Sequence, residues 1–218
     1  MSTGPSVRHT VSVSDWDDFV AVCYFGREGD WLDRCIRCAY LDMNRTLHGL
    51  GTLGEGHAGW KTAMLRALRG RLTMLPGEDT WTQASFDAWH HESVDALKRV
   101  SSEHGFPLSV GQAQKWINMS IKYAIALGEH RVPGLHCVYD VAHVALDNIV
   151  LVRLEELGMP PLGCAWSRLD EYNRYMQCQQ WVHDHFPDAC SLEVEYRLWQ
   201  GDPGNAGEGR KQKEINDG

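Results

Sequence analysis

The sequence predicts a single all-α domain. Apolar residues recur with the three- to four-residue spacing of helices over most of the chain, and Gly and Pro residues separate the periodic stretches. Of the 218 residues, 43% are hydrophobic and 23% are charged, which are ordinary fractions for a globular protein. A chain of this length is long enough for one domain with one core. Fibrous, low-complexity and disulfide-rich classes are therefore excluded.

Four helices are expected in the first half of the chain, because each stretch has the apolar spacing of one buried face. Their expected ranges are 15–24, 30–50, 58–75 and 82–102. Gly49 begins a glycine-rich stretch at the end of the second, Pro76 closes the third, and Gly105 and Pro107 follow the fourth. Glycine and proline disfavour the continuation of a helix, so these residues set the boundaries.

Three further helices are expected in the second half. Their ranges are 109–127, 147–157 and 167–186. Ser109 stands three residues before Gln112, and Ser167 stands three residues before Asp170, so both helix starts have the spacing of a capping box. Gly158, with the prolines that follow it, closes the helix over 147–157.

The two ends of the chain fall outside this helical pattern. Residues 1–14 are expected to form a flexible N-terminus or a short strand, and residues 201–218, rich in glycine and charge, a disordered tail. Residues 191–198 alternate apolar and polar side chains, which favours a strand paired with residues 7–13. The predicted helical domain therefore spans residues 15–200.

Composition also bears on the setting of the protein. There is no apolar run near the roughly 18 residues that cross a bilayer, and the polar N-terminus lacks the apolar core of a signal peptide. The seven cysteines are odd in number and irregularly spaced, which is typical of a reducing compartment. We therefore expect a cytoplasmic protein with no membrane partner and no disulfides.

Charge is unevenly distributed. The net charge of −8 argues against a protein that coats nucleic acid through its overall field. Residues 45–73, however, carry five basic side chains and a single acidic one. The basic residues are Arg45, Lys61, Arg66, Arg69 and Arg71. We expect an anionic ligand such as nucleic acid to contact them, and the alternative interpretation is a solvated helix face.

Residues 109–158 contain the most informative pattern. Lys115, Asn118 and Lys122 fall on one face of the predicted helix, at positions i, i+3 and i+7. Asp147 stands directly before the next helical run. A structural interpretation is available for each, since the lysines could face water and aspartate is a preferred N-cap that contributes about 1 kcal/mol.

Taken together, this pattern resembles the helix-hairpin-helix DNA glycosylases, and most closely their archaeal 8-oxoguanine DNA glycosylase branch. The resemblance covers residues 109–158: a Gln–Lys pair, a lysine seven residues later, and an aspartate at a helix start. By this resemblance Lys115 matches the nucleophile, Lys122 the second active-site lysine and Asp147 the catalytic aspartate. No hairpin of the LPGVG type is present, and Leu146 stands where valine or isoleucine is more usual.

The resemblance implies a specific chemistry. An uncharged Lys115 amine attacks the anomeric carbon and displaces the base, which leaves a Schiff base through which the sugar is cleaved. Burial beside the like charge of Lys122 would favour the neutral amine. Asp147, at a helix N-terminus, would stay ionised, stabilise an oxocarbenium-like sugar and help to take the proton from the amine.

The base itself needs partners. Gln114 and Asn118 are expected to hydrogen-bond its edge, Trp116 to stack on it, and His143 to complete the substrate-binding set. His143 and Asp147 also stand four residues apart, but neither this spacing nor any other His or Cys spacing matches a metal motif. We therefore expect no metal and no cofactor.

Two function classes remain. The first is a base-excising N-glycosylase, with or without lyase activity, that acts on modified DNA or on a related nucleoside. The second is a non-catalytic helical interaction or regulatory protein, in which Lys115, Asn118 and Lys122 are surface residues. Burial distinguishes them, because a catalytic lysine must face a pocket together with Asp147.

Overall fold

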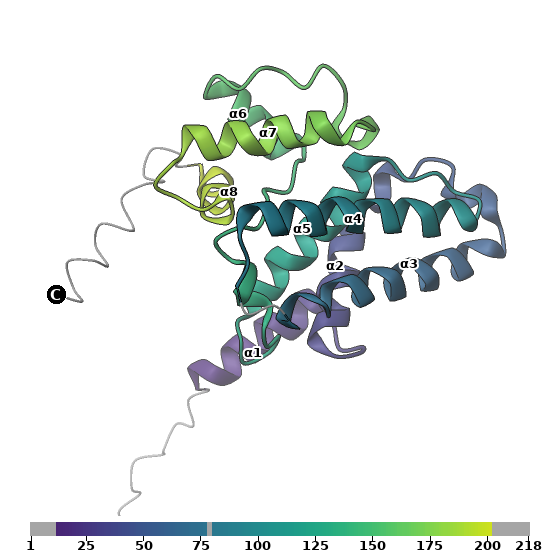
Figure 1. Ribbon diagram of the computed structural model, residues 1–218. Helices are drawn as coiled ribbons and strands as arrows, with labels where there is room; N and C mark the ends of the chain where they lie inside the picture. Colours follow the sequence, from purple (N-terminus) through teal and green to yellow (C-terminus); the bar gives the residue numbers. More distant parts are fainter. Residues whose placement is uncertain (1–11, 78–79, 202–218) are drawn as a thin grey trace, which may run out of the picture.

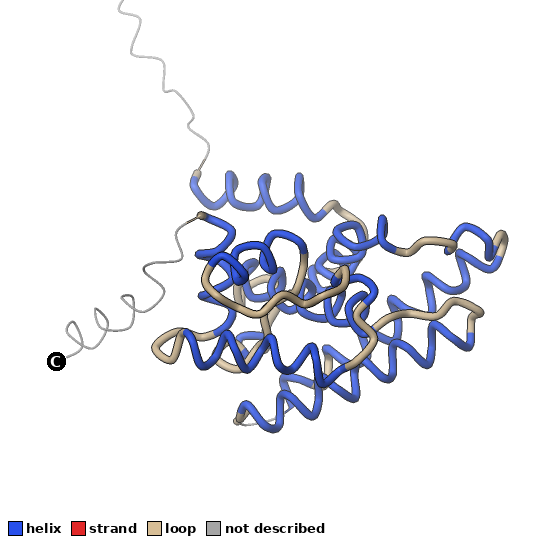
Figure 2. The backbone as a smooth tube through the Cα atoms, turned by 90° about the horizontal axis from the view of Figure 1, so that it is seen from above, coloured by secondary structure: helices blue, strands red, loops and turns tan. Residues whose placement is uncertain are grey.

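The computed structural model describes residues 12–77 and 80–201, and within them it contains helices and loops but no strand (Figure 2). The all-α prediction is confirmed for this part of the chain. The α-helices are α1 (Val13–Phe25), α2 (Trp31–Met43), α3 (Gly56–Leu72), α4 (Gln83–Glu103), α5 (Val110–Leu127), α6 (Asn148–Glu156), α7 (Tyr172–His185) and α8 (Ser191–Gln200). No described helix has both the length and the apolar character needed to cross a membrane.

Helix α5 is the centre of the fold. Sixteen of its eighteen residues are buried. It packs most extensively against α2, while α4, α7 and the short 3₁₀ turn Trp166–Arg168 cover other sides, and α3 lies beside α4 (Figure 1). Because α5 is buried nearly all round, its polar residues must find partners inside the protein rather than in water.

One predicted capping box is confirmed and the other is wrong. The Ser109 hydroxyl accepts from the Gln112 N–H at 3.0 Å, and the Gln112 side chain accepts from the Ser109 N–H at 3.1 Å. Ser167 instead lies in the turn Trp166–Arg168, and α7 begins later, at Tyr172. The Asp170 carboxylate is bonded elsewhere, to Lys98 Nζ at 2.6 Å.

The helix expected over residues 30–50 ends at Met43. The Thr46 hydroxyl donates to the Met43 carbonyl at 2.7 Å, and the Leu47 N–H bonds to Asn44 in a 3₁₀ turn. The side chain thus takes the carbonyl that the next turn of an α-helix would need.

The strand expected over residues 191–198 is also wrong, because this segment forms helix α8. The proposed partner segment, 7–13, lies outside the described residues except for Ser12, which caps α1, and Val13, with which α1 begins. The expectations for residues 1–11 and 202–218 likewise lie outside the described part.

Candidate active site

Lys115 and Asp147 lie together in a pocket of about 370 Å³. Helices α1, α2, α5, α6 and α8 and the turn Trp166–Arg168 contribute to its lining. The other charged residues that line it are Asp42 and Arg45. Its aromatic residues are Tyr24, Tyr123, Trp166 and Trp199. The structure therefore brings the two central residues of the sequence pattern into one cavity, although 32 positions separate them.

The two residues form a buried ion pair. Lys115 Nζ lies 2.5 Å from Asp147 Oδ2, and the two side chains are 3% and 12% exposed. Asp147 is also the N-cap of α6, since its Oδ1 accepts from the Val150 N–H at 2.8 Å. One carboxylate therefore combines the capping role with the lysine contact. The helix N-terminus stabilises its negative charge, and its second oxygen is positioned to accept a proton from the amine.

A second polar group in the pocket comes from α1, α2 and α5. The Tyr123 hydroxyl donates to Asp42 Oδ2 at 2.7 Å, and the Tyr24 hydroxyl lies 3.0 Å from that of Tyr123. Burial, with Tyr24 and Asp42 adding to it, raises the pKa of Tyr123, so its hydroxyl stays protonated. Sequence reasoning missed these residues, because no local spacing connects positions 24, 42 and 123.

Lys122 lies elsewhere than expected. Its ammonium group forms an ion pair with Glu195, which is wholly buried, and lies 5.4 Å from the centre of the Trp199 ring. Lys122 is not among the residues that line the pocket with Lys115. Each lysine pairs with its own carboxylate, so Lys122 acts on the pocket together with Glu195 and not as a lone like charge.

Gln114 and Asn118, expected to bind the base, are buried inside the protein. The Gln114 amide bonds to both backbone groups of Leu146, accepting from its N–H at 3.2 Å and donating to its carbonyl at 2.9 Å. The Asn118 amide donates to the Tyr175 hydroxyl and to the Val144 carbonyl. Their hydrogen-bonding groups are therefore used within the fold, not turned toward a ligand.

Trp116, expected to stack on a base, is wholly buried. Its indole N–H donates to the Ile36 carbonyl at 2.9 Å, and its ring packs against Tyr40 and Trp60, with centroids 5.3 and 6.2 Å away. A ring enclosed in this way has no free face for a ligand. The exposed aromatic residues of the pocket, such as Trp199, are better placed for stacking.

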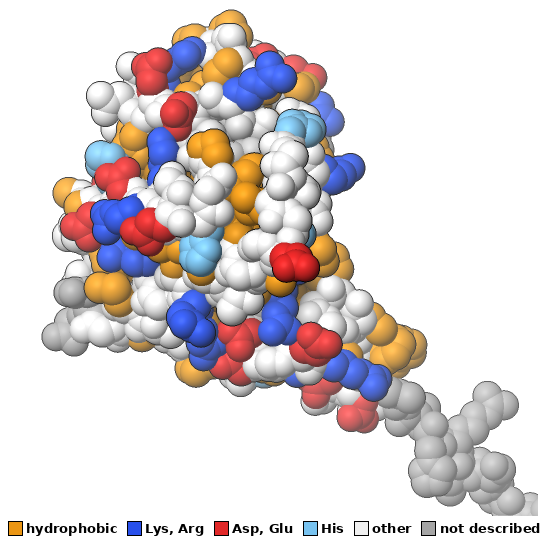
Figure 3. Space-filling view, turned by 90° about the vertical axis from the view of Figure 1, so that its right-hand side faces the viewer, with side chains coloured by type: hydrophobic (Ala, Val, Ile, Leu, Met, Phe, Trp, Pro, Cys, Tyr) orange, Lys and Arg blue, Asp and Glu red, His pale blue; other side chains and the backbone are white. Residues whose placement is uncertain are grey.

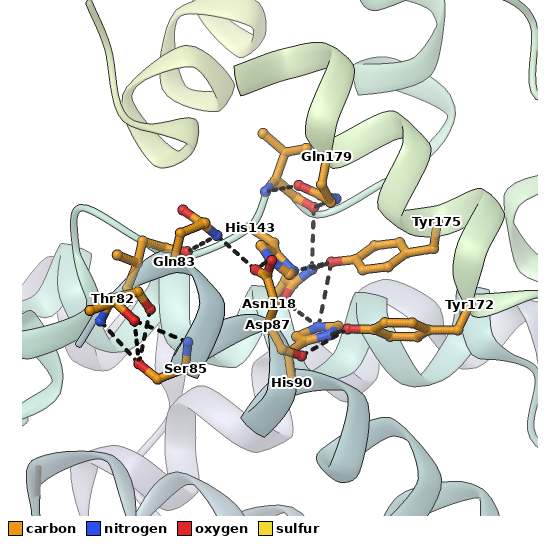
Figure 4. A network of polar contacts seen from close by, with 12 residues as sticks. Thr82, Gln83, Ser85, Asp87, His90, Asn118, His143, Tyr172, Tyr175 and Gln179 are labelled. Atoms are coloured by element: carbon orange, nitrogen blue, oxygen red, sulfur yellow. Dashed lines mark hydrogen bonds and ion pairs between the residues drawn. The ribbon is translucent and has the colours of Figure 1, made fainter. Parts of the chain in front are cut away.

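His143 belongs to a different cluster, in which side chains from α4, α5 and α7 converge (Figure 4). Its Nε2 lies 2.8 Å from Asp87 and its Nδ1 lies 2.9 Å from the Tyr175 hydroxyl. His143 and Asp87 line a second cavity of about 200 Å³. Burial lowers the pKa of His143, so the ring is neutral, with Nε2 donating to Asp87. The structure thus does not bring His143 to the Lys115 pocket.

Three of the five basic residues expected to meet an anion already have partners within the protein. Arg45 is exposed and lines the pocket, and Arg66 is exposed on α3. Arg69 is bound by Asp30 and Asp33, and Arg71 by Glu92. The Lys61 ammonium lies over the Tyr40 ring. On the face in Figure 3, basic and acidic side chains are interspersed.

Among the described residues, no group of three or more His, Cys, Asp or Glu side chains is arranged to hold a metal ion. The acidic residues that line the Lys115 pocket are Asp42 and Asp147. No known protein family, curated protein or solved structure matches the chain.

Proposed function

We propose that this protein is a base-excising N-glycosylase that uses Lys115 as nucleophile and Asp147 as its catalytic partner. The observation that carries the proposal is the buried Lys115–Asp147 pair, whose oxygen and nitrogen atoms lie 2.5 Å apart in a pocket. In a surface interaction module Lys115 would lie in solvent, whereas its side chain is 3% exposed. Paired charges buried in a cavity are more typical of a reacting site than of a solvated face.

The pair supplies each part of the first step. Asp147 Oδ2 takes a proton from Lys115 Nζ, and the free amine then attacks the anomeric carbon. A new C–N bond forms while the bond between sugar and base breaks, and the base leaves with that electron pair and takes the proton from Asp147. The ionised Asp147 then stabilises the positive charge of the sugar–lysine intermediate. Opening of the sugar ring gives a Schiff base, from which loss of a C2′ proton expels the 3′-phosphate and cleaves the strand.

The rest of the pocket suits a planar base. Its volume of about 370 Å³ lies within the usual range for small-ligand cavities, about 300–1,000 Å³. Trp199, which is 49% exposed, offers an aromatic face for stacking, and Asp42 offers a carboxylate that can accept hydrogen bonds from N–H groups of the base. We propose modified DNA, of the 8-oxoguanine type, as the substrate, with a free nucleoside as the alternative outcome of the test.

The test is borohydride trapping. An oligonucleotide duplex that contains one 8-oxoguanine is incubated with the protein and borohydride, and a covalent adduct is expected because borohydride reduces a Schiff base to a stable amine. Lys115→Gln should abolish the adduct. Base release from DNA and from the free nucleoside is measured in parallel, so that release from the nucleoside alone would identify the smaller substrate.

Lys98→Gln is the matched control. Lys98 also pairs with an aspartate, Asp170, at 2.6 Å, but neither residue lines the pocket. This variant should trap DNA at the wild-type rate. If neither release nor trapping is seen over a panel of damaged bases, or if Lys115→Gln traps as well as Lys98→Gln, the glycosylase proposal is wrong.

A further inference from the structure

Side chains hydrogen-bond the backbone of the segment that precedes Asp147. Residues 144–146 are wholly buried and lie in neither a helix nor a strand. Buried backbone groups outside regular structure need other partners, and here side chains supply them. Gln179 binds both backbone groups of Val144 at 3.0 Å, Glu195 accepts the Ala145 N–H at 2.8 Å, and Gln114 binds both groups of Leu146.

We call these three side chains, Gln114 from α5, Gln179 from α7 and Glu195 from α8, the cradle of residues 144–146. The cradle joins three helices at one short segment. Asp147 follows this segment directly, so the position of its carboxylate beside Lys115 depends on the cradle. The three side chains form the kind of hydrogen bonds with this backbone that a neighbouring strand forms in a sheet.

Glu195 differs from the two glutamines because it brings a negative charge into the core. Its side chain is 0% exposed. One carboxylate oxygen accepts the Ala145 N–H and the other pairs with Lys122. Without Lys122, this carboxylate would be a buried charge with no counter-charge, which strongly disfavours the folded arrangement. Lys122 is thus linked to Asp147 through Glu195 and the backbone of residues 145–147.

We propose that Lys122 is a positioning residue and not a reacting group: through Glu195 it fixes the segment that aims Asp147 at Lys115. The inference rests on the proposed function for its effect on activity. It differs from the role that the sequence resemblance implies, in which Lys122 takes part at the reacting centre. The geometry favours positioning, because Lys122 is absent from the pocket lining while Asp147 is part of it.

Three variants separate the two roles: Lys122→Met, Glu195→Gln, and the double variant. Each single change leaves one buried charge unpaired. The double change removes both charges, and the glutamine that replaces Glu195 can still accept the Ala145 N–H through its carbonyl oxygen. We expect the trapping rate at saturating DNA to fall about 100-fold in each single variant, as for a misplacement of about 1 Å. In the double variant we expect recovery to within about tenfold of wild type.

Amide hydrogen exchange of residues 144–146 is the second readout, and it does not depend on activity. Protection should fall in the single variants and return in the double variant. The double variant is compared directly with wild type, so the test holds even if a single variant fails to fold. KM should change less than kcat, because neither of the residues changed lines the pocket.

Two results would overturn the positioning role. One is a double variant that keeps its amide protection but traps as poorly as Lys122→Met, because Lys122 would then be needed for the reaction itself. The other is a Lys122→Met variant with wild-type trapping and protection. If the wild-type protein traps no DNA, the proposed function fails, and the exchange experiment alone decides whether Lys122 and Glu195 hold the segment.

Discussion

Asp147→Asn separates the two bonds that this carboxylate makes. Asparagine is itself a good N-cap, so the bond from the Val150 N–H is kept and α6 loses little stability. The negative charge beside Lys115 is lost, and Lys115, at 3% exposure, is left without its counter-charge. Removal of one partner of a buried ion pair costs about 3–5 kcal/mol of the free energy of unfolding. The double variant Lys115→Met/Asp147→Asn removes both charges and should recover at least half of that loss.

The wild type, the single variants Lys115→Met and Asp147→Asn, and the double variant form a double-mutant cycle. Urea unfolding of these four proteins, followed by far-ultraviolet circular dichroism, measures their free energies of unfolding. The signal is the non-additivity of the two changes, which reports the coupling between the two side chains. A loss below about 1 kcal/mol for Asp147→Asn, or free energies that simply add in the double variant, would show that the pair is not a buried, mutually dependent one. Lys115 and Asp147 would then not be coupled as the proposed proton transfer requires.

Three further predictions concern the rest of the molecule. Arg45→Ala should weaken oligonucleotide binding and reduce the slope of log K against log salt by about one unit, because one phosphate contact is lost; an unchanged slope would remove Arg45 from the interface. Burial lowers the pKa of both His90 and His143, while in the unfolded chain they titrate near 6.5. As the pH falls, the unfolded chain therefore takes up protons before the folded one. The free energy of unfolding, measured with urea, should be highest above pH 6.5 and decline below it. A flat profile between pH 7.5 and 5 would contradict the buried neutral rings. Gly111→Ala should displace the turn Trp166–Arg168 and lower the melting temperature, because the new Cβ would lie 1.7 Å from the Trp166 carbonyl oxygen. The control Gly70→Ala has open space around it in α3 and should raise the free energy of unfolding by up to about 1 kcal/mol. Equal melting temperatures of the two variants would refute the close approach at Gly111.

The error at α8 shows where hydrophobic patterning stops being informative. Leu192, Glu195 and Leu198 lie three residues apart and are all buried, which is helical spacing. One member of the buried face is an acid, so a pattern that counts apolar residues sees alternation instead. Glu195 can be buried because Lys122, 73 positions away, pairs with it. That pairing arises only in the tertiary structure, so the sequence around Glu195 does not reveal it.

The candidate site was predictable where local rules determine it. Asp147 could be identified because an aspartate directly before a helical run is an N-cap, and the structure has it there. The face that carries Lys115, Asn118 and Lys122 was also predictable, but the partner of each residue was not. Trp199 and Asp42 come from elements far apart in the chain, so only the packing of α2 and α8 against α5 and α6 brings them to the pocket.

We have proposed that Lys115 is the nucleophile, and locating the covalent bond tests this assignment. The adduct trapped by borohydride on 8-oxoguanine DNA is digested with nuclease and protease and mapped by tandem mass spectrometry. We expect the sugar remnant on Nζ of Lys115, the lysine of the buried pair with Asp147. A remnant on Lys122, on Lys61 or on the N-terminal amine would contradict it.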